Sequence, residues 1–408
     1  MHINRRALLG TAAAAAATSL PLVRARAEAP SLKIGVLTDL SGPYKDLAGP
    51  QAIQAVYQAL EDYGAAAKGL KVEVISADHQ NKPDVGAGIA RQWYDREGVD
   101  IIVEVANSGV ALAVAGVAKE KNKVYINSGA ATSDLTGANC NGNTIHWAYD
   151  TYMLAKSTGG ALAKAGGDSW FFITADYAFG HALQRDTTGF IEASGGKVVG
   201  SIAYPFPGTT DFSSMLLQAQ NSGAKVLGIS NAGTDTINTI KQAKEFGITM
   251  TLAGLLLFIS DVHALGLETA QGIVLTDSFY WDMNDRTRAF SARLQKKFPS
   301  GRPTMVDAGV YSSTLHWLKV AGDAGVPFMK GSGTEVVARL KAMPTDDDCF
   351  GQGIIRADGR KIHPSYLWKI KKPSESKGPW DYYAPVSFTP ADQAFRPLAA
   401  GGCPLVKA

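Results

Sequence analysis

Residues 33–44 read KIGVLTDLSGPY, a short apolar run followed at once by a loop that holds an acid, a glycine and a proline. An apolar run without polar alternation is typical of a strand that is buried on both faces of a sheet. Residues 49–63 then read as an amphipathic helix. A strand, a loop and a helix in this order predict a parallel sheet covered by helices, whose ligands bind in the loops at the carboxyl ends of the strands.

The same alternation continues along the chain and divides into two sets. The first set continues with expected strands at 72–78, 101–105 and 124–127 and helices at 84–97 and 109–122. The second set has expected strands at 170–175, 197–201, 226–230 and 249–257 and helices at 151–165, 180–193, 211–222 and 234–246. A strand at 273–277, helices at 284–298 and 305–324, and a hairpin at Asp358-Gly359 with its second strand at 366–370 complete the pattern. The expected fold class is α/β, with two Rossmann-like lobes, each a parallel sheet flanked by helices, joined by a multi-strand hinge.

The expected division of the chain follows from these two sets. It comprises an export signal at 1–27, lobe 1 at 28–148 plus 280–348, lobe 2 at 149–279 plus 349–372, and a coiled C-terminal tail at 373–408. The hinge is expected where the chain changes lobe, near 147–151, 277–281 and 343–350.

The N-terminal segment and the charge balance bear on location and partners. Arg5-Arg6, the apolar stretch 7–23 and the Ala25-Arg26-Ala27 site predict export to the periplasm, by the twin-arginine route or by the ordinary secretory route. The chain has 40 basic and 37 acidic residues, and four of the arginines lie in the first 27 residues. The mature chain is therefore almost neutral, which argues against nucleic acid or an anionic lipid surface as a partner.

Three cysteines fit an oxidising compartment with at most one disulfide. We expect Cys140 to pair with Cys403, which would tie down the C-terminal tail, and a Cys349–Cys403 bond is the competing pairing. The seven histidines are scattered, so no metal site and no cofactor are expected.

Three loops that follow expected strands carry a family resemblance. They read DLSGPY at 39–44, SGAATSDLT at 128–136 and DYAFG at 176–180. In this order, behind an export segment, they resemble the type I periplasmic binding proteins of the branched-chain amino acid (leucine/isoleucine/valine) transport family, in its aromatic-acid-type subgroup. The resemblance implies a monomer whose two lobes close on a small-molecule ligand and then dock on the permease of an ABC transporter in the inner membrane, without catalysis.

The resemblance also implies a set of ligand-binding positions. Asn107 and Ser108 match the first binding loop, and Ala130, Ala131 and Thr132 match the second, where a backbone N–H and a hydroxyl hold a carboxylate. From lobe 2, Asn231 and Gly233 match ligand-contacting positions. A helix start favours an anion, but Thr132 or the residues after Gly233 can equally serve as helix caps.

One departure from the family pattern concerns the ligand. Where amino-acid-binding members carry an acid that pairs with the ligand ammonium, this chain reads GLLLF at 254–258, with Leu256 in the loop. A buried ammonium without a counter-charge costs several kcal/mol, so we expect a ligand without an α-ammonium group.

Aromatic residues in the facing loops indicate what the ligand is. They are Tyr44, Tyr177, Phe179, Phe258, Phe279, Tyr280 and Trp281, and three or four of them are expected to touch a planar aromatic acid. Asp150 and Tyr152, with Trp281, form a second group of candidates near the crossings. The alternatives are a branched-chain amino acid or amide ligand, or a soluble sensor for a membrane kinase. A hydrolase is disfavoured, because Gly228–Ala232 only faintly echoes a nucleophile elbow and lacks a recognisable His–acid pair.

Overall fold

The first strand lies inside the parallel sheet of lobe 1. In the computed structural model, which describes residues 31–407, β1 (Leu32–Thr38) has nearly all of its side chains buried. It pairs in parallel with β2 (Val72–Asp78) on one side and β3 (Ile101–Glu104) on the other. With β4 (Val124–Asn127) and β5 (Thr144–His146), these strands form a parallel sheet in the order β2-β1-β3-β4-β5.

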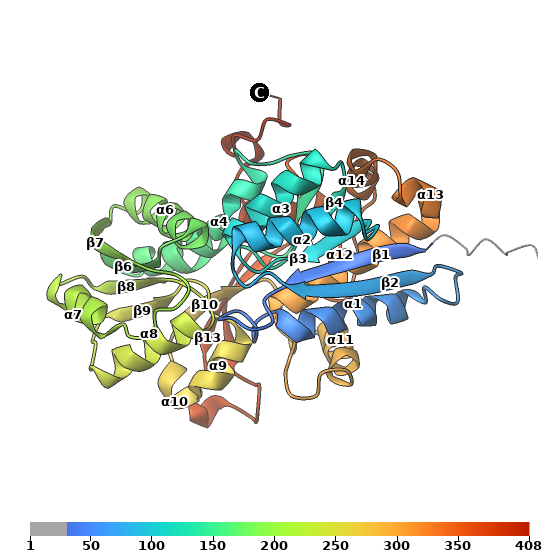
Figure 1. Cartoon of the computed structure of the whole chain (residues 1–408). Helices are drawn as coiled ribbons and strands as arrows, with labels where there is room; N and C mark the ends of the chain where they lie inside the picture. Colours follow the sequence, from blue (N-terminus) through green and yellow to red (C-terminus); the bar gives the residue numbers. More distant parts are fainter. Residues whose placement is uncertain (1–30, 408) are drawn as a thin grey trace, which may run out of the picture.

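Helices cover both faces of this sheet, as a parallel sheet requires. Helices α2 (Pro83–Asp95) and α3 (Ser108–Glu120) pack together on one face, and α1 (Gly49–Tyr63) packs on α12 (Met305–Ala324) at the other. The nearly all-buried α12 starts with a capping box between Thr304 and Asp307. Lobe 1 also holds α11 (Asp285–Gln295), α13 (Val326–Met329) and α14 (Gly333–Ala342). Figure 1 shows these helices around the lobe 1 strands.

Lobe 2 is built on a seven-stranded sheet in the order β14-β13-β10-β9-β8-β6-β7. The strands β6 (Ser169–Ala175), β7 (Lys197–Tyr204), β8 (Val226–Ser230), β9 (Thr251–Gly254) and β10 (Val274–Asp277) run parallel. The helices of this lobe are α4 (Thr151–Leu154), α5 (Gly160–Lys164), α6 (Ala178–Ala193), α7 (Ser213–Asn221), α8 (Thr234–Glu245), α9 (Ile259–Leu265) and α10 (Leu267–Ala270), with one π-helical turn, Ala155–Gly159, between α4 and α5. The α/β class with two parallel-dominated lobes is confirmed.

Two expectations about the last third of the chain are wrong: the second strand of the hairpin, and a tail without strands. The hairpin around Asp358-Gly359 joins β11 (Ile354–Ile355) to β12 (Lys361–Ile362), so 366–370 is not its second strand. This hairpin lies against the end of β5 in lobe 1, where the His146 amide donates to the Gly359 carbonyl at 2.9 Å, whereas the expected division assigned 349–372 to lobe 2. Lobe 2 regains the chain only at β13 (Ser365–Ile370), which is antiparallel to β10.

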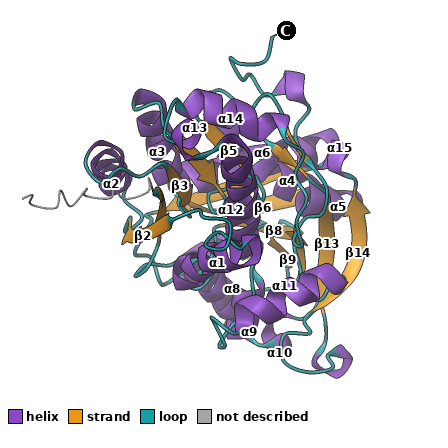
Figure 2. Cartoon of the chain, turned by 90° about the vertical axis from the view of Figure 1, so that its right-hand side faces the viewer, coloured by secondary structure: helices purple, strands orange, loops and turns teal. Residues whose placement is uncertain are grey.

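The C-terminal tail is not all coil. Residues Tyr383–Thr389 form β14, which pairs antiparallel with β13 at the outer edge of the lobe 2 sheet (Figure 2). Pro385 lies within this strand, and proline is accepted there because an edge strand has one side without ladder hydrogen bonds. After α15 (Ala391–Ala394) the chain returns to lobe 1.

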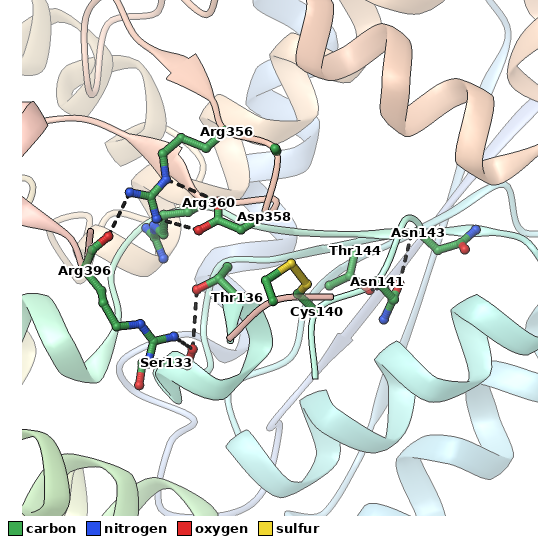
Figure 3. Close-up of a disulfide and its surroundings, with 12 residues drawn as sticks. Ser133, Thr136, Cys140, Asn141, Asn143, Thr144, Arg356, Asp358, Arg360 and Arg396 are labelled. Atoms are coloured by element: carbon green, nitrogen blue, oxygen red, sulfur yellow. Dashed lines mark hydrogen bonds and ion pairs between the residues drawn. A yellow bond between two sulfur atoms is a disulfide. The ribbon is translucent and has the colours of Figure 1, made fainter. Parts of the chain in front are cut away.

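A disulfide attaches the C-terminal segment to lobe 1. Cys140 is bonded to Cys403, with a Cα–Cα distance of 5.5 Å (Figure 3). Cys349 is a free, buried thiol. The predicted pairing is confirmed, and the competing one is excluded. Arg396 reinforces the attachment by donating to the Ser133 carbonyl at 2.9 Å. The predicted export signal lies outside the described residues, and within 31–407 no helix combines the length and the apolar character needed to cross a membrane.

Candidate functional site

A cavity lies between the two lobes at the carboxyl ends of their strands. It has about 220 Å³ of empty space, part of which opens to solvent, and none of its eleven lining residues carries a charge. Lobe 1 contributes Tyr44, Leu47, Ala106, Gly129 and Ala131, the crossing after β5 contributes Tyr149, and lobe 2 contributes Tyr177, Phe179, Ala232, Leu256 and Phe258. Six predicted residues therefore line this cavity: Tyr44, Ala131, Tyr177, Phe179, Leu256 and Phe258.

Aromatic rings from both lobes meet at this cavity. The Tyr44 and Tyr177 hydroxyls are 2.5 Å apart across the lobe boundary. Phe206 stacks on both of these rings, with centroid distances of 5.4 Å and 4.4 Å. Burial raises the pKa of both tyrosines, so their hydroxyls are neutral at physiological pH and can donate hydrogen bonds. Four of the seven aromatic residues singled out in the sequence line the cavity.

A backbone contact brings the same two loops together. The Thr234 amide donates to the Pro43 carbonyl at 3.2 Å, across the lobe boundary. The preceding Gly233 has φ +60, and a Cβ at that position would clash with the Pro43 carbonyl oxygen. Gly233 therefore permits the approach of the lobes, and it does not line the cavity.

The second predicted binding loop offers one free backbone donor. The Ala130 amide donates to Asn127 Oδ1 at 3.1 Å, so it is not available to a ligand, which corrects its predicted role. The Ala131 amide has no hydrogen-bond partner within residues 31–407, and Ala131 lines the cavity. Thr132 Oγ1 accepts from the Asp134 amide at 3.3 Å as a cap, which leaves its hydroxyl proton free to donate.

Three long helices begin next to the cavity. Helix α3 starts after the Ala106 loop, α6 starts beside Phe179, and α8 starts after Ala232. The N-terminus of a helix carries a partial positive charge and unpaired N–H groups, and it favours an anion. A carboxylate without a protein counter-charge can therefore be held in this cavity.

Glu104, which the sequence reasoning missed, lies under the cavity floor at the end of β3. Its side chain is fully buried, and neither carboxyl oxygen has a hydrogen-bond partner of normal geometry in the described chain. Burial raises the pKa of Glu104 to about 8, although Thr38 and the Val105 amide favour the ionised form. Glu104 and Val105 have φ of +80 and +68, a backbone conformation that is strained for residues other than glycine. Gly129 separates the carboxyl group from the cavity, because a Cβ there would clash with Glu104 Oε1.

The predicted asparagines and Ser108 serve their own loops. Asn107 caps α3 by accepting from the Val110 amide at 3.0 Å. Asn231 donates to Thr239 and accepts from Thr236 at the start of α8. Ser108 Oγ accepts from the Thr132 amide at 3.2 Å. None of the three is among the lining residues.

The remaining candidates lie away from the cavity. Tyr280 and Trp281 both donate to the Trp380 carbonyl, at 3.2 Å and 2.9 Å, in a cluster at the crossing after β10. Asp150 caps α4 through the Met153 amide. Tyr152 packs edge-on against a lobe 2 ring, Phe190, at a centroid distance of 5.2 Å, and Phe279 packs in the same way against Phe290.

Five lining residues were not predicted: Leu47, Ala106, Gly129, Tyr149 and Ala232. Ala106 and Ala232 each precede or follow a predicted asparagine by one position. The sequence therefore predicts that both residues lie at the end of a strand. Their small apolar side chains do not indicate that they contact a ligand.

The comparisons with known proteins show the family and the fold. The profile of the periplasmic binding protein family matches residues 31–378. A periplasmic binding protein from Burkholderia mallei is 49% identical, with a TM-score of 0.88 over 92% of this chain and 99% of its own. A branched-chain amino acid ABC transporter periplasmic ligand-binding protein from Burkholderia xenovorans is 40% identical, with a TM-score of 0.80 over 92% of this chain and 100% of its own. An ABC transporter solute-binding protein from R. palustris, solved with benzoate, is 20% identical, with a TM-score of 0.80 over 89% of this chain and 97% of its own, and shares the fold.

Proposed function

The chain belongs to the periplasmic binding protein family, the solute-binding components of ABC importers, and we propose that its cleft captures a planar aromatic carboxylic acid and delivers it to the permease. The observation that carries this proposal is the uncharged cavity walled by Tyr44, Tyr177, Phe179 and Phe258. Aromatic walls stack on a flat ring and exclude water from it.

The polar groups at the cavity fit a carboxylate. The Ala131 amide lies at the cavity and can donate to the carboxylate oxygens, and the hydroxyl of the adjacent Thr132, which is not itself a lining residue, is the second candidate donor. The starts of α3, α6 and α8 favour the negative charge of the carboxylate. Leu256 lines the cavity with an apolar side chain. The ammonium group of an amino-acid ligand would need an acidic side chain at this wall. The Tyr44–Tyr177 pair adds a polar group that suits a ring hydroxyl.

Glu104 gives a specific reason to keep a second candidate, a branched-chain amino acid. It is a buried acid directly behind Gly129, and in its ionised form it would attract an ammonium in the cavity. The raised pKa of Glu104 favours its neutral form, which is why we rank the aromatic acid first.

A thermal-shift and calorimetric screen tests the proposal. Benzoate and 4-hydroxybenzoate should raise the melting temperature by mass action, and leucine, isoleucine and valine should not. Phe179→Leu should weaken benzoate binding, while Phe246→Leu, at a residue 47% exposed, is the matched control and should not. Tight binding of leucine without binding of benzoate would support the second candidate and overturn the first.

A further inference from the structure

A second groove lies between the lobes, on the other side of the loops that wall the cavity. It has about 970 Å³ of empty space and opens to solvent. Tyr44 and Leu47 line the inner cavity, while Lys45 and Asp46, from the same loop, line the groove. In lobe 2, Phe258 lines the inner cavity, and α9, which begins at the next residue, lines the groove.

The lobe 2 wall of this groove is an aromatic shelf. The Trp380 ring stacks on the His263 imidazole, with a centroid distance of 3.9 Å and an angle of 9°. Its carbonyl accepts from Trp281 Nε1 and from the Tyr280 hydroxyl. Trp380 has φ +73, which is strained for a tryptophan, so two hydrogen bonds and a ring stack hold this residue in an unfavourable backbone conformation at the groove.

The lobe 1 wall supplies positive charge. The Arg302 guanidinium lies over the Trp281 ring at 4.9 Å and has no acidic partner in the part of the chain that the structure describes. Lys45, on the same wall, also has no ion pair among residues 31–407. Of the two acids at this groove, Asp46 is exposed beside Lys45, and Asp261 is buried and uses Oδ2 to accept the Phe258 amide at 2.9 Å.

We propose that this groove is a second binding site, for a planar aromatic anion, in which Trp380 stacks on the ring and Arg302 and Lys45 hold the acidic group. Arg302 and Trp380 line the same groove, and Arg302 is held over a different ring, that of Trp281. The guanidinium can therefore pair with the acid of a flat anion while the Trp380 indole covers its ring. Because the groove and the inner cavity share two loops, a ligand bound in the groove is adjacent to the cleft before the lobes close.

The proposal extends the proposed function, since the same class of ligand would occupy both sites. Fluorine NMR of the mature chain titrated with 4-fluorobenzoate distinguishes binding in the inner cavity from binding in the groove. We expect one bound species that saturates at one equivalent, from the inner cavity, and a second, weaker phase beyond it, from the groove. Higher salt should weaken the second phase more, because its charges are exposed to solvent.

Two variants address the groove alone. Arg302→Gln and Trp380→Leu should each weaken the second phase by about fivefold or more, the effect of losing about 1 kcal/mol of contact, and should leave the first phase unchanged. Lys297→Gln is the matched control, because Lys297 pairs with Glu61 at 2.6 Å outside the groove. Melting temperatures confirm that each variant is folded.

The outcomes separate the two proposals. Absence of a second phase in the wild type, its survival in both variants, or equal weakening by Lys297→Gln overturns the groove site and leaves the inner site standing. Absence of the first phase with a second phase that responds to Arg302→Gln overturns the aromatic-acid assignment of the cleft and supports the groove.

Discussion

Replacing Glu104 by glutamine should change how the stability of the protein depends on pH. Burial raises the pKa of Glu104 to about 8 from an ordinary value of 4.5. The folded state therefore keeps a proton between these two pH values that the unfolded state has lost. Stability falls with rising pH over this window, by about 1.4 kcal/mol per pH unit from this one group. The stability that the neutral Glu104 carboxyl group provides, relative to the ionised group, is fully present below pH 4.5 and is lost by about pH 8.

At pH 7 the accumulated cost of Glu104 is about 3 kcal/mol, because pH 7 lies some 2.5 units above the unfolded pKa. Glutamine has the same shape and no proton to lose. Glu104→Gln should therefore match the wild type near pH 4.5 and exceed its unfolding free energy increasingly toward pH 8. Asp277, a buried acid with a raised pKa that is not among the charges acting on Glu104, is present in both proteins and cancels in the difference.

The assay is urea unfolding of both proteins at half-unit steps from pH 4.5 to pH 8.5. Glu268→Gln, which removes one exposed carboxylate from α10, controls for the change in net charge. A difference between wild type and Glu104→Gln that stays constant over this range would show that Glu104 is ionised throughout, and the assignment of a neutral acid under the cleft would be wrong.

Four further expectations concern the cleft and the tail. Tyr177→Phe removes the hydroxyl pair with Tyr44 and should weaken binding of the cleft ligand by about 1 kcal/mol, measured by calorimetry, whereas Tyr57→Phe, on the exposed side of α1, should not. Thr132→Val should cost about 1.5–3 kcal/mol of binding if its hydroxyl donates to a carboxylate, and an unchanged dissociation constant would reduce Thr132 to a cap. Gly233→Ala should hinder closure, because a Cβ there meets the Pro43 carbonyl, so ligand should not reduce the radius of gyration in solution scattering, whereas we expect it to do so in the wild type. Cys403→Ser should lower the unfolding free energy by about 2–4 kcal/mol, since the bond closes a loop of sequence separation 263, and an equal loss in Cys349→Ser would contradict this.

The positions of most strands were predictable from the sequence, because short apolar runs indicate buried strands and helical spacing indicates the helices between them. β1, β3, β4, β6 and β8 fall where the apolar runs predicted them. β14 could not be predicted in the same way, because its segment contains Pro385 and lies among serines, glycines and lysines. Its pairing depends on the exposed edge of β13, a tertiary feature that local composition does not report. Glu104 was visible as an acid within the apolar run IIVEV, but its neutral state depends on burial by residues distant in sequence.

The predicted loop residues that do not line the cavity share one physical feature. Sequence reasoning selected Asn107, Ala130 and Asn231, which do not line the cavity. Their neighbours do: Ala106 and Ala232, which were not predicted, and Ala131, which was. A loop that ends a buried strand has unpaired backbone groups, and a buried polar group left unpaired costs more than a hydrogen bond returns. The asparagine side chains supply the missing hydrogen-bond partners. Asn107 caps α3, Asn231 donates to Thr239 in α8, and Asn127 accepts from the Ala130 amide. Once the polar side chains are committed to the loop, small neighbours remain to face the cavity, and they leave space for the ligand and access to the Ala131 amide. In this fold the polar residues of a binding loop therefore mark where the site is, and the residues beside them form its surface.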